Sequence, residues 1–373
     1  MPSPVLMVDL TGQYLKIKEE IETAVAEVIA SSTFINGPQV TRFASHLADY
    51  LAVPYIIPCA NGTDALQIAL MALDLKPGDE VIVPAFTYVA PAEVIGLLGL
   101  VPVVVEVDAH NFNMLPLALE DAYSSKTRAV IPVHLFGQCA DMDPIMEWAK
   151  RRGVYVVEDA AQSLGAKYKG QRAGTMGDIG CTSFFPTKNL GCFGDGGALM
   201  TKDALLAEKI RMIARHGQRK KYVHEVLGCN SRLDTLQAAI LDIKLKYLDD
   251  YEHARHQAAQ RYSQDLQGIE GVICPLQEPF ATHVFHQYTL RVLKGKRNEL
   301  QRHLAASGIP SMVYYPLPVH RQPAFGSLVR RAGSLEVSDQ LCGEVLSIPM
   351  HTELTPQIQD KITEQIKEFF FRK

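Results

Sequence analysis

The sequence predicts an α/β protein with a large, doubly wound, mostly parallel β-sheet and a smaller α+β domain. Between about residues 56 and 200, short apolar runs alternate with helical patterns, the order that builds a parallel sheet. The run at 103–107 is apolar almost throughout, as expected for a strand that helices cover on both faces. Seven strands are expected, at residues 56–59, 81–84, 103–107, 129–134, 154–158, 181–185 and 197–201.

Helices are expected in the gaps between these strands. Helical patterns fill residues 64–73, 92–98 and 143–151. Turn signals mark the boundaries, because Lys76-Pro77-Gly78-Asp79 precedes the second strand and Arg152-Gly153 precedes the fifth. This alternation favours crossover helices that lie on the two faces of one sheet.

The pattern changes after residue 202. Residues 234–267 contain no Gly or Pro and predict one long helix or a bent pair of helices. Strand-like runs at 286–293 and 311–315 flank a helical pattern at 298–307. The C-terminal part is therefore expected to mix helices and strands.

A chain of 373 residues is long enough for about two domains. We expect a large α/β domain over residues 20–233 and a smaller α+β domain over residues 234–373. Residues 1–19 could pack on the smaller domain.

Charge and hydropathy exclude several kinds of partner. The net charge is −4 and no basic block stands out beyond Arg219-Lys220-Lys221, so no nucleic acid partner is expected. The most apolar run, 94–105, is shorter than the roughly 20 residues of a membrane span, and the N-terminus lacks signal-peptide features. Seven cysteines without Cys-x-x-Cys spacing favour reduced thiols. A cytoplasmic protein without a membrane segment is therefore expected.

Ligands of an open α/β sheet bind beyond the carboxyl ends of its strands, so the residues there are the candidates for a site. The first strand ends in Asn61-Gly62-Thr63-Asp64 and runs directly into a helix. A helix N-terminus exposes amide groups that suit a phosphate, although this segment alone could be an ordinary turn and N-cap. The second strand ends in Phe86-Thr87-Tyr88, which offers an aromatic face to a planar ring.

Two further strand ends carry an acidic pair and a lysine. The fifth strand ends in Glu158-Asp159, and the sixth continues through Ser183 to Lys188 into a glycine-rich stretch at 191–197. Burial lowers the pKa of a lysine, and its neutral amine can form a Schiff base. Pyridoxal phosphate (PLP) needs a phosphate site, a stacking partner, an acid for its ring nitrogen and a lysine. The four strand ends together supply each of these.

In these segments the chain resembles the DegT-type (DegT/DnrJ/StrS) sugar aminotransferases, a branch of the fold-type I PLP transferases. The resemblance covers nearly the whole length and rests on several ordered motifs. These are Asn61-Gly62-Thr63-Asp64-Ala65-Leu66, Pro84-Ala85-Phe86-Thr87-Tyr88-Val89-Ala90, Glu158-Asp159-Ala160-Ala161-Gln162-Ser163, Ser183-Phe184-Phe185-Pro186-Thr187-Lys188 and Asn230-Ser231-Arg232-Leu233-Asp234.

The resemblance implies a role for each residue around the cofactor ring. Lys188 is the expected Schiff-base lysine and proton shuttle. Asp159 is expected to pair with the pyridinium nitrogen, and Gln162 to lie against the hydroxyl side of the ring. Tyr88 is expected to stack on the ring.

The same resemblance implies a phosphate site and an assembly. Gly62 and Thr63 are expected to hold the phosphate through backbone amides, and Ser183 through its hydroxyl. Asn230 matches a position that reaches the phosphate from the neighbouring subunit, which implies a homodimer with shared active sites. Three further residues fall in segments that line the nucleotide-sugar side: Arg232, Tyr315 and His320.

The implied reaction is transamination with L-glutamate as the amino donor. Glutamate leaves its amino group on the cofactor as pyridoxamine 5'-phosphate, and a keto-sugar nucleotide then accepts it. Some members of this group are dehydratases in which a histidine replaces the lysine. Lys188 departs from that pattern and favours amination.

The sugar is suggested by three segments, 59–67, 137–141 and 215–218, that look most like the subgroup that aminates a 3-keto sugar. That subgroup includes enzymes that convert UDP-2-acetamido-2-deoxy-3-ketoglucuronic acid to its 3-amino product for lipopolysaccharide O-antigen. Amination at C4, or of a dTDP-linked sugar, remains open.

Two other classes of enzyme lack the residues that they would need. A dinucleotide oxidoreductase would need a Gly-x-Gly-x-x-Gly motif that opens a helix, and the sequence has none. A metal hydrolase could use His283 and His286, but no placed carboxylate accompanies them, so no metal is expected and both histidines are interpreted as structural. A non-catalytic PLP-binding regulatory protein stays an alternative.

Overall fold

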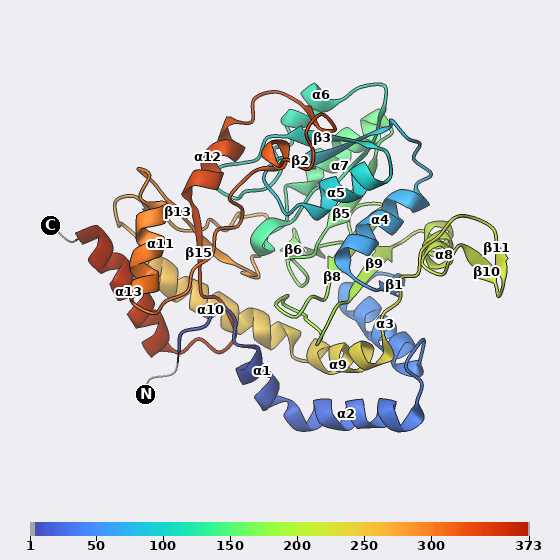
Figure 1. The fold of residues 1–373 in the computed structure, drawn as a ribbon, viewed down its shortest axis with the longest axis horizontal. Helices are drawn as coiled ribbons and strands as arrows, with labels where there is room; N and C mark the ends of the chain where they lie inside the picture. The colour runs from blue at the N-terminus through green and yellow to red at the C-terminus, as the bar shows by residue number, and fades with distance from the viewer. Residues whose placement is uncertain (1–3, 372–373) are drawn as a thin grey trace.

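The computed structural model describes residues 4–371, and within them one large sheet forms the centre of the molecule (Figure 1). Its strands lie in the order β1-β9-β8-β5-β4-β2-β3-β14. The bounds, in that order, are Tyr55–Cys59, Gly197–Thr201, Ile179–Ser183, Tyr155–Asp159, Thr127–Val130, Glu80–Pro84, Val101–Val105 and Arg330–Arg331.

The sheet is parallel except around β9, which pairs antiparallel with both β1 and β8. The seven predicted strands are confirmed, with ends shifted by a few residues. The eighth strand, β14, was not predicted. It adds Arg330 and Arg331 in parallel to Val103 and Val104 of β3.

Helices cover both faces of the sheet, which confirms the doubly wound class. Alternate residues of β2 enter different cores: Ile82 joins one, and Val81 and Val83 join the other. The core around Ile82 is covered by α3 (Pro38–Leu51), α7 (Met142–Arg152) and α9 (Thr235–Leu245). The other core is covered by α4 (Gly62–Ala72), α5 (Ala90–Leu97) and α8 (Ala204–Ile213).

A separate apolar core lies in the C-terminal part, around Tyr262, Tyr288 and Leu346. Val5 belongs to this core, and the amide of Met350 donates to the carbonyl of Met7. A three-stranded sheet and three long helices build it: β12 (Val272–Ile273), β13 (Tyr288–Val292), β15 (Val345–Ile348), α10 (Leu248–Leu266), α11 (Arg297–Ala306) and α13 (Pro356–Phe371). The domain boundary at residue 234 stays a prediction, since α9 packs on the first core.

Two predictions for the C-terminal part are resolved by the structure. The helix expected over 234–267 is a bent pair, because α9 ends at Leu245 and α10 begins at Leu248. The strand expected at 311–315 is wrong, since only Met312 forms a bridge, with Ser347. Pro310 and Pro316 enclose this segment and cannot donate ladder hydrogen bonds, which keeps it out of the sheet.

The remaining elements lie around these cores. A hairpin of β10 (Gln218–Lys220) and β11 (Val223–His224) projects from the body near α8 (Figure 1). No helix within residues 4–371 is both long and apolar enough to span a membrane. The other elements are α1 (Leu10–Lys16), α2 (Lys18–Ser31), α6 (Ala118–Ala122), α12 (Glu336–Glu344), β6 (Lys167–Tyr168), β7 (Gln171–Arg172) and two 3-10 turns, η1 (Leu135–Gly137) and η2 (Val319–Arg321).

Candidate active site

A cavity of about 720 Å³ lies beyond the carboxyl ends of β1, β5 and β8. Strand ends meet here because β1, β5 and β8 run in the same direction. Residues from distant parts of the sequence therefore share one wall. The predicted site residues that line this cavity are Gly62, Thr63, Tyr88, Asp159, Gln162, Ser183, Lys188 and Tyr315.

One end of the cavity is the N-terminus of α4. The Asn61 side chain caps this helix by accepting the Asp64 amide at 2.8 Å, whereas the helix itself offers no acceptor to the amides of Gly62 and Thr63. A Cβ on Gly62 would lie 2.7 Å from the Cβ of Ser183, so only glycine lets α4 begin this close to β8. Free amides at the positive end of a helix beside a hydroxyl form an anion site.

Glu158 and Asp159 end β5 and have different surroundings. Glu158 is fully buried and accepts the amides of Gly174, Met176 and Gly177 at 2.6–2.8 Å. Its other partner is His134, whose Nδ1 accepts the Ala140 amide, so Nε2 carries the hydrogen and donates to Glu158 at 2.9 Å. Burial alone would raise the pKa of Glu158, but these hydrogen bonds hold the pKa below its ordinary value. Glu158 therefore stabilises the fold, and its carboxylate is not available to a ligand.

Asp159 lines the cavity instead. Its Oδ1 accepts the Ala161 amide at 3.0 Å. Burial raises the pKa of Asp159, while the Ala161 amide and the charge of Lys188 oppose that rise. A carboxylate that burial destabilises in this way is available to a cation placed in the cavity.

Lys188 follows β8 and lies in the same wall. Burial lowers the pKa of Lys188 to about 8, and the negative charge of Asp159 limits the fall. No described residue hydrogen-bonds to its Nζ. A lysine with this pKa keeps a useful neutral fraction near neutral pH, which a nucleophilic amine requires.

Aromatic side chains close the cavity. Tyr88 is 53% exposed, and its ring lies 5.9 Å from that of Tyr315, centroid to centroid. The Gln162 side chain fixes Tyr315, because its Nε2 donates to the Tyr315 hydroxyl at 3.0 Å. The Oε1 of Gln162 accepts the Phe136 amide at 2.7 Å. The cavity therefore combines an anion site, an acid, a nucleophilic amine and an aromatic wall, which fits a phosphorylated cationic heterocycle such as PLP.

Residues 15–367 match the DegT/DnrJ/EryC1/StrS aminotransferase family. The chain belongs to this family. It is an aminotransferase, and its cofactor is PLP.

Three relatives are similar to this chain over nearly its whole length. A "Pleiotropic regulatory protein" of Geobacillus stearothermophilus is 47% identical over 98% of both chains. The UDP-2-acetamido-2-deoxy-3-oxo-D-glucuronate aminotransferase of Pseudomonas aeruginosa is 47% identical over 93% of this chain and 95% of that protein. The dTDP-3-amino-3,4,6-trideoxy-alpha-D-glucose transaminase of Streptomyces venezuelae is 40% identical over 97% and 95%.

Among solved structures, a DegT DnrJ EryC1 StrS aminotransferase from Brucella abortus has a TM-score of 0.95 at 40% identity, over 99% of this chain and 100% of that chain. NtdA from Bacillus subtilis, with bound cofactor PMP, has a TM-score of 0.91 at 31% identity, over 100% and 86%. The fold-type I class is confirmed by these likenesses.

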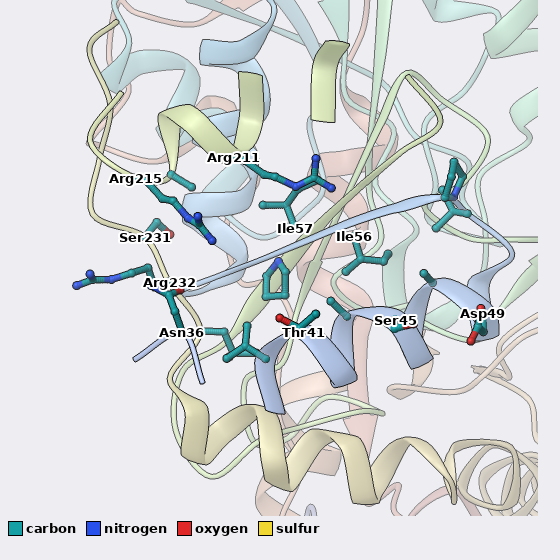
Figure 2. Close-up of a pocket in the computed structure, with 18 of the residues that line it drawn as sticks. Asn36, Thr41, Ser45, Asp49, Ile56, Ile57, Arg211, Arg215, Ser231 and Arg232 are labelled. Atoms are coloured by element: carbon teal, nitrogen blue, oxygen red, sulfur yellow. The ribbon is translucent and has the colours of Figure 1, made fainter. Parts of the chain in front are cut away.

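Three predicted residues of this aminotransferase lie outside the cavity of their own chain. Arg232 lines a separate groove of about 690 Å³ between α3, β1 and α8, where Figure 2 shows it at the same end as Arg215 and Asn36. Asn230 is exposed beside this groove, and its backbone forms an isolated antiparallel β-bridge with that of Arg215. His320 is buried, with its Nε2 3.2 Å from Oδ1 of Asp339.

The aminotransferase cavity also has lining residues that the sequence did not predict. Thr187, Asp195, Gln287 and Tyr314 are among them, and so is His286, which was interpreted as structural. The segment 286–287 reads in the sequence as the start of a strand, and no motif marks it as part of a site. Hydrogen bonds to the η1 turn hold this segment at the cavity, from the amide of Val284 to the carbonyl of Gly137 and from the amide of Gln287 to the carbonyl of Phe136.

Proposed function

We propose that this aminotransferase moves the amino group of L-glutamate to C3 of UDP-2-acetamido-2-deoxy-3-ketoglucuronic acid, in the cytoplasm, for lipopolysaccharide O-antigen synthesis. The Pseudomonas aeruginosa relative that is named for this substrate supports the choice at 47% identity. The observation that carries the chemistry is the meeting of Lys188, Asp159 and the N-terminus of α4 in one cavity.

The residues of the cavity have distinct tasks in this proposal. When bound, the cofactor supplies an electron sink for the reacting carbon. Lys188 attaches the cofactor, and its Nζ, with a pKa of about 8, can take up and return a proton during the reaction. Asp159 offers its carboxylate to the cationic ring nitrogen, Tyr88 covers a ring face, and Gln162 lies on the hydroxyl side.

The start of α4 is the proposed binding site for the cofactor phosphate. The amides of Gly62 and Thr63 and the hydroxyl of Ser183 provide the donors. The close packing of Gly62 on Ser183 supports this assignment. It leaves no room for a Cβ on Gly62, so the start of α4 and the Ser183 side chain lie side by side. Tyr315, which lines the cavity beside Tyr88 and Gln162, is assigned to the sugar.

We propose that a second copy of the chain completes each site. Asn230 and Arg232 lie outside the cavity of their own chain, on the segment that follows the projecting hairpin β10–β11. In a homodimer, this segment can enter the partner's site and bring Asn230 to the phosphate and Arg232 to the nucleotide sugar. His320 is already paired with Asp339, so its ring is not expected to contact the substrate.

Two alternatives have support of their own. A dTDP-linked 3-keto sugar is favoured by the Streptomyces venezuelae relative, because that transaminase is named for a dTDP-linked 3-amino sugar. A regulatory role is favoured by the name of the Geobacillus stearothermophilus relative. The intact Lys188 and Asp159 together argue for turnover, because an acid at the ring nitrogen serves the electron-sink chemistry of the ring, which a protein that only binds the cofactor does not perform.

A substrate panel tests the proposal. Purified enzyme with glutamate is mixed with 3-keto and 4-keto sugars linked to UDP or dTDP, and the amino-sugar products are identified by NMR. The expected result is amination of the UDP-linked 3-keto uronate and no product with Lys188→Ala. Preference for a dTDP sugar or for a 4-keto sugar would overturn the substrate assignment, and absence of any product would favour the regulatory role.

A further inference from the structure

Lys188 lies on a short loop, residues 184–196, which we call the lysine loop. Phe184 closes this loop, because its amide donates to the Gly196 carbonyl at 2.7 Å and its carbonyl accepts the Cys192 amide at 2.8 Å. No described residue hydrogen-bonds to Nζ of Lys188, so no such bond holds the amine at the tip of the side chain. The position of the amine in the cavity therefore depends on what fixes the backbone of the lysine loop.

Helix α9 contacts the returning limb of the lysine loop with two side chains. The Nζ of Lys244 donates to the Gly191 carbonyl at 2.5 Å. Gln237 binds the backbone of Phe193 twice, since its Oε1 accepts the Phe193 amide at 2.8 Å and its Nε2 donates to the Phe193 carbonyl at 3.3 Å. Residues seven positions apart share one face of a helix, so both side chains reach the loop from the same side.

The limb that Lys244 holds lies directly against the residues that precede Lys188. A Cβ on Gly191 would lie 2.4 Å from the Pro186 carbonyl oxygen and 2.8 Å from that of Phe185, so the two limbs touch through their backbones. The Lys188 amide in turn donates to the Phe185 carbonyl at 2.8 Å. A displacement of Gly191 would therefore be passed to the turn that carries Lys188.

The surroundings of Lys244 indicate that its ammonium serves the lysine loop. Its side chain is 2% exposed, and within residues 4–371 no carboxylate pairs with it. Burial lowers the pKa of Lys244 to about 8, and the positive charge of Arg255 on α10 acts in the same direction. An unpaired buried cation destabilises a fold, whereas an apolar side chain of similar length would avoid that penalty. What the ammonium adds is a donor for the buried Gly191 carbonyl, which receives no other hydrogen bond from the described residues.

We propose that Lys244 and Gln237 are positioning residues for the aminotransferase reaction, because they hold the lysine loop in the conformation that keeps the free Lys188 amine in the cavity. Lys188 must leave the cofactor and return to it in every cycle, so its amine has to stay within reach while it is detached. A misplacement of about 1 Å can slow such a step by about 100-fold. The anion site at α4 and the carboxylate of Asp159 belong to other elements, so binding of the cofactor does not require Lys244 or Gln237. This inference rests on the proposed function only in taking Lys188 as the cofactor lysine.

The test separates binding of the cofactor from its attachment. Cofactor-free enzyme is mixed with PLP, and stopped-flow absorbance gives the rate at which Lys188 becomes attached. Lys244→Met keeps the length of the side chain and loses the donor, so attachment should slow by about tenfold to 100-fold. The same substitution in a Lys188→Ala background, where this attachment is impossible, should leave the affinity for PLP unchanged. Lys246→Met, which removes only an exposed ion pair with Glu20, is the matched control and should attach PLP at the parent rate.

Gln237→Met is a second variant, and its side chain is only partly buried, so the loss should not prevent folding. It should likewise slow attachment and leave the affinity in the Lys188→Ala background unchanged. Parent rates of attachment in both variants would overturn the proposal. So would an equal loss of PLP affinity with and without Lys188, because that pattern indicates a distorted pocket. Borohydride reduction of the holoenzyme, followed by mapping of the attached cofactor, tests Lys188 separately, and a cofactor found on another lysine would overturn the assignment on which the proposed function depends.

Discussion

Glu158 and Asp159 are consecutive residues of β5, yet Glu158 holds the loop at 174–177 and Asp159 faces the cavity of Lys188. Successive side chains of a strand point to opposite sides, which separates the two acids. The sequence offered both as candidates for a charged partner of a cationic ring. The hydrogen bonds of Glu158 show that it stabilises the fold, whereas Asp159 lines the cavity.

Replacing Asp159 should therefore affect the reaction more than the fold. In Asp159→Asn the ring nitrogen of the cofactor loses its anionic partner, and we expect kcat to fall by about 10- to 150-fold, the range of one charge-assisted hydrogen bond. Steady-state kinetics with glutamate and thermal denaturation of the same sample make the comparison. A variant that unfolds early but turns over normally would contradict this assignment.

Glu158→Gln should show the opposite pattern. The amide group would turn an N–H₂ toward backbone donors or toward His134, which leaves buried donors without acceptors. We expect the free energy of unfolding to fall by about 3 kcal/mol. Urea denaturation measures the change, and the fraction that remains folded should keep most of its activity. Equal stability of the variant and the parent enzyme would show that Glu158 is not needed to hold the 174–177 loop.

Gly62→Ala should weaken cofactor binding, because its Cβ would lie 2.7 Å from the Cβ of Ser183 and push the start of α4 away. Overpacking of this kind costs about 1–3 kcal/mol. Ser183→Gly in the same chain removes the clashing atom, so stability should recover. Affinity for the cofactor should stay low in the double variant, since the Ser183 hydroxyl is lost. Calorimetry and a cofactor titration separate the two effects.

The pKa of Lys188, about 8, predicts how cofactor attachment depends on pH. The neutral amine is the reactive form, so the rate of attachment to the cofactor-free enzyme should rise with pH and level off above about 8. An ordinary lysine would keep rising toward its pKa of roughly 10.4. Because the charge of Asp159 raises the pKa of Lys188, Asp159→Asn should move the midpoint to lower pH. Stopped-flow absorbance measures these rates, and a midpoint that moves to higher pH would contradict the electrostatic coupling.

Mixed dimers test whether sites are shared. Enzyme with Lys188→Ala and enzyme with Asn230→Ala should each have low activity when prepared alone. If Asn230 acts in the partner's site, a hybrid dimer contains one site with both residues intact, and mixing after partial denaturation should restore activity. Asn230→Ala alone should bind cofactor about tenfold more weakly, as for one lost hydrogen bond. No recovery on mixing would place Asn230 in a purely structural role.

The sequence predicted the central sheet well because its strands are buried on both faces and appear as continuous apolar runs. β14 escaped prediction because Arg330 and Arg331 have no apolar pattern and join the sheet only through β3. The strand predicted at 311–315 is absent because β-branched and aromatic residues there resemble a strand, while the flanking prolines limit pairing to the bridge at Met312.

The candidate site was predictable where a motif coincides with a strand end, as at Asp159 and Lys188. His286 was not, because its environment depends on Arg255, which lies 31 residues earlier in the chain. Apart from the family motif, which assigned Asp159 to the ring nitrogen, the residue types alone could not separate Glu158 from Asp159. That distinction requires the position of the loop at 174–177.

The cavity wall contains residues from Asn61 to Tyr315, so most of the chain must be in place before the pocket exists. A ligand that binds only such a completed pocket stabilises the whole native state, by about 2.7 kcal/mol when its concentration is a hundred times its Kd. Vitamin B6 status in the cell would then influence how much of this enzyme resists heat and proteolysis. The supply of a small molecule thereby becomes a factor in the lifetime of the protein.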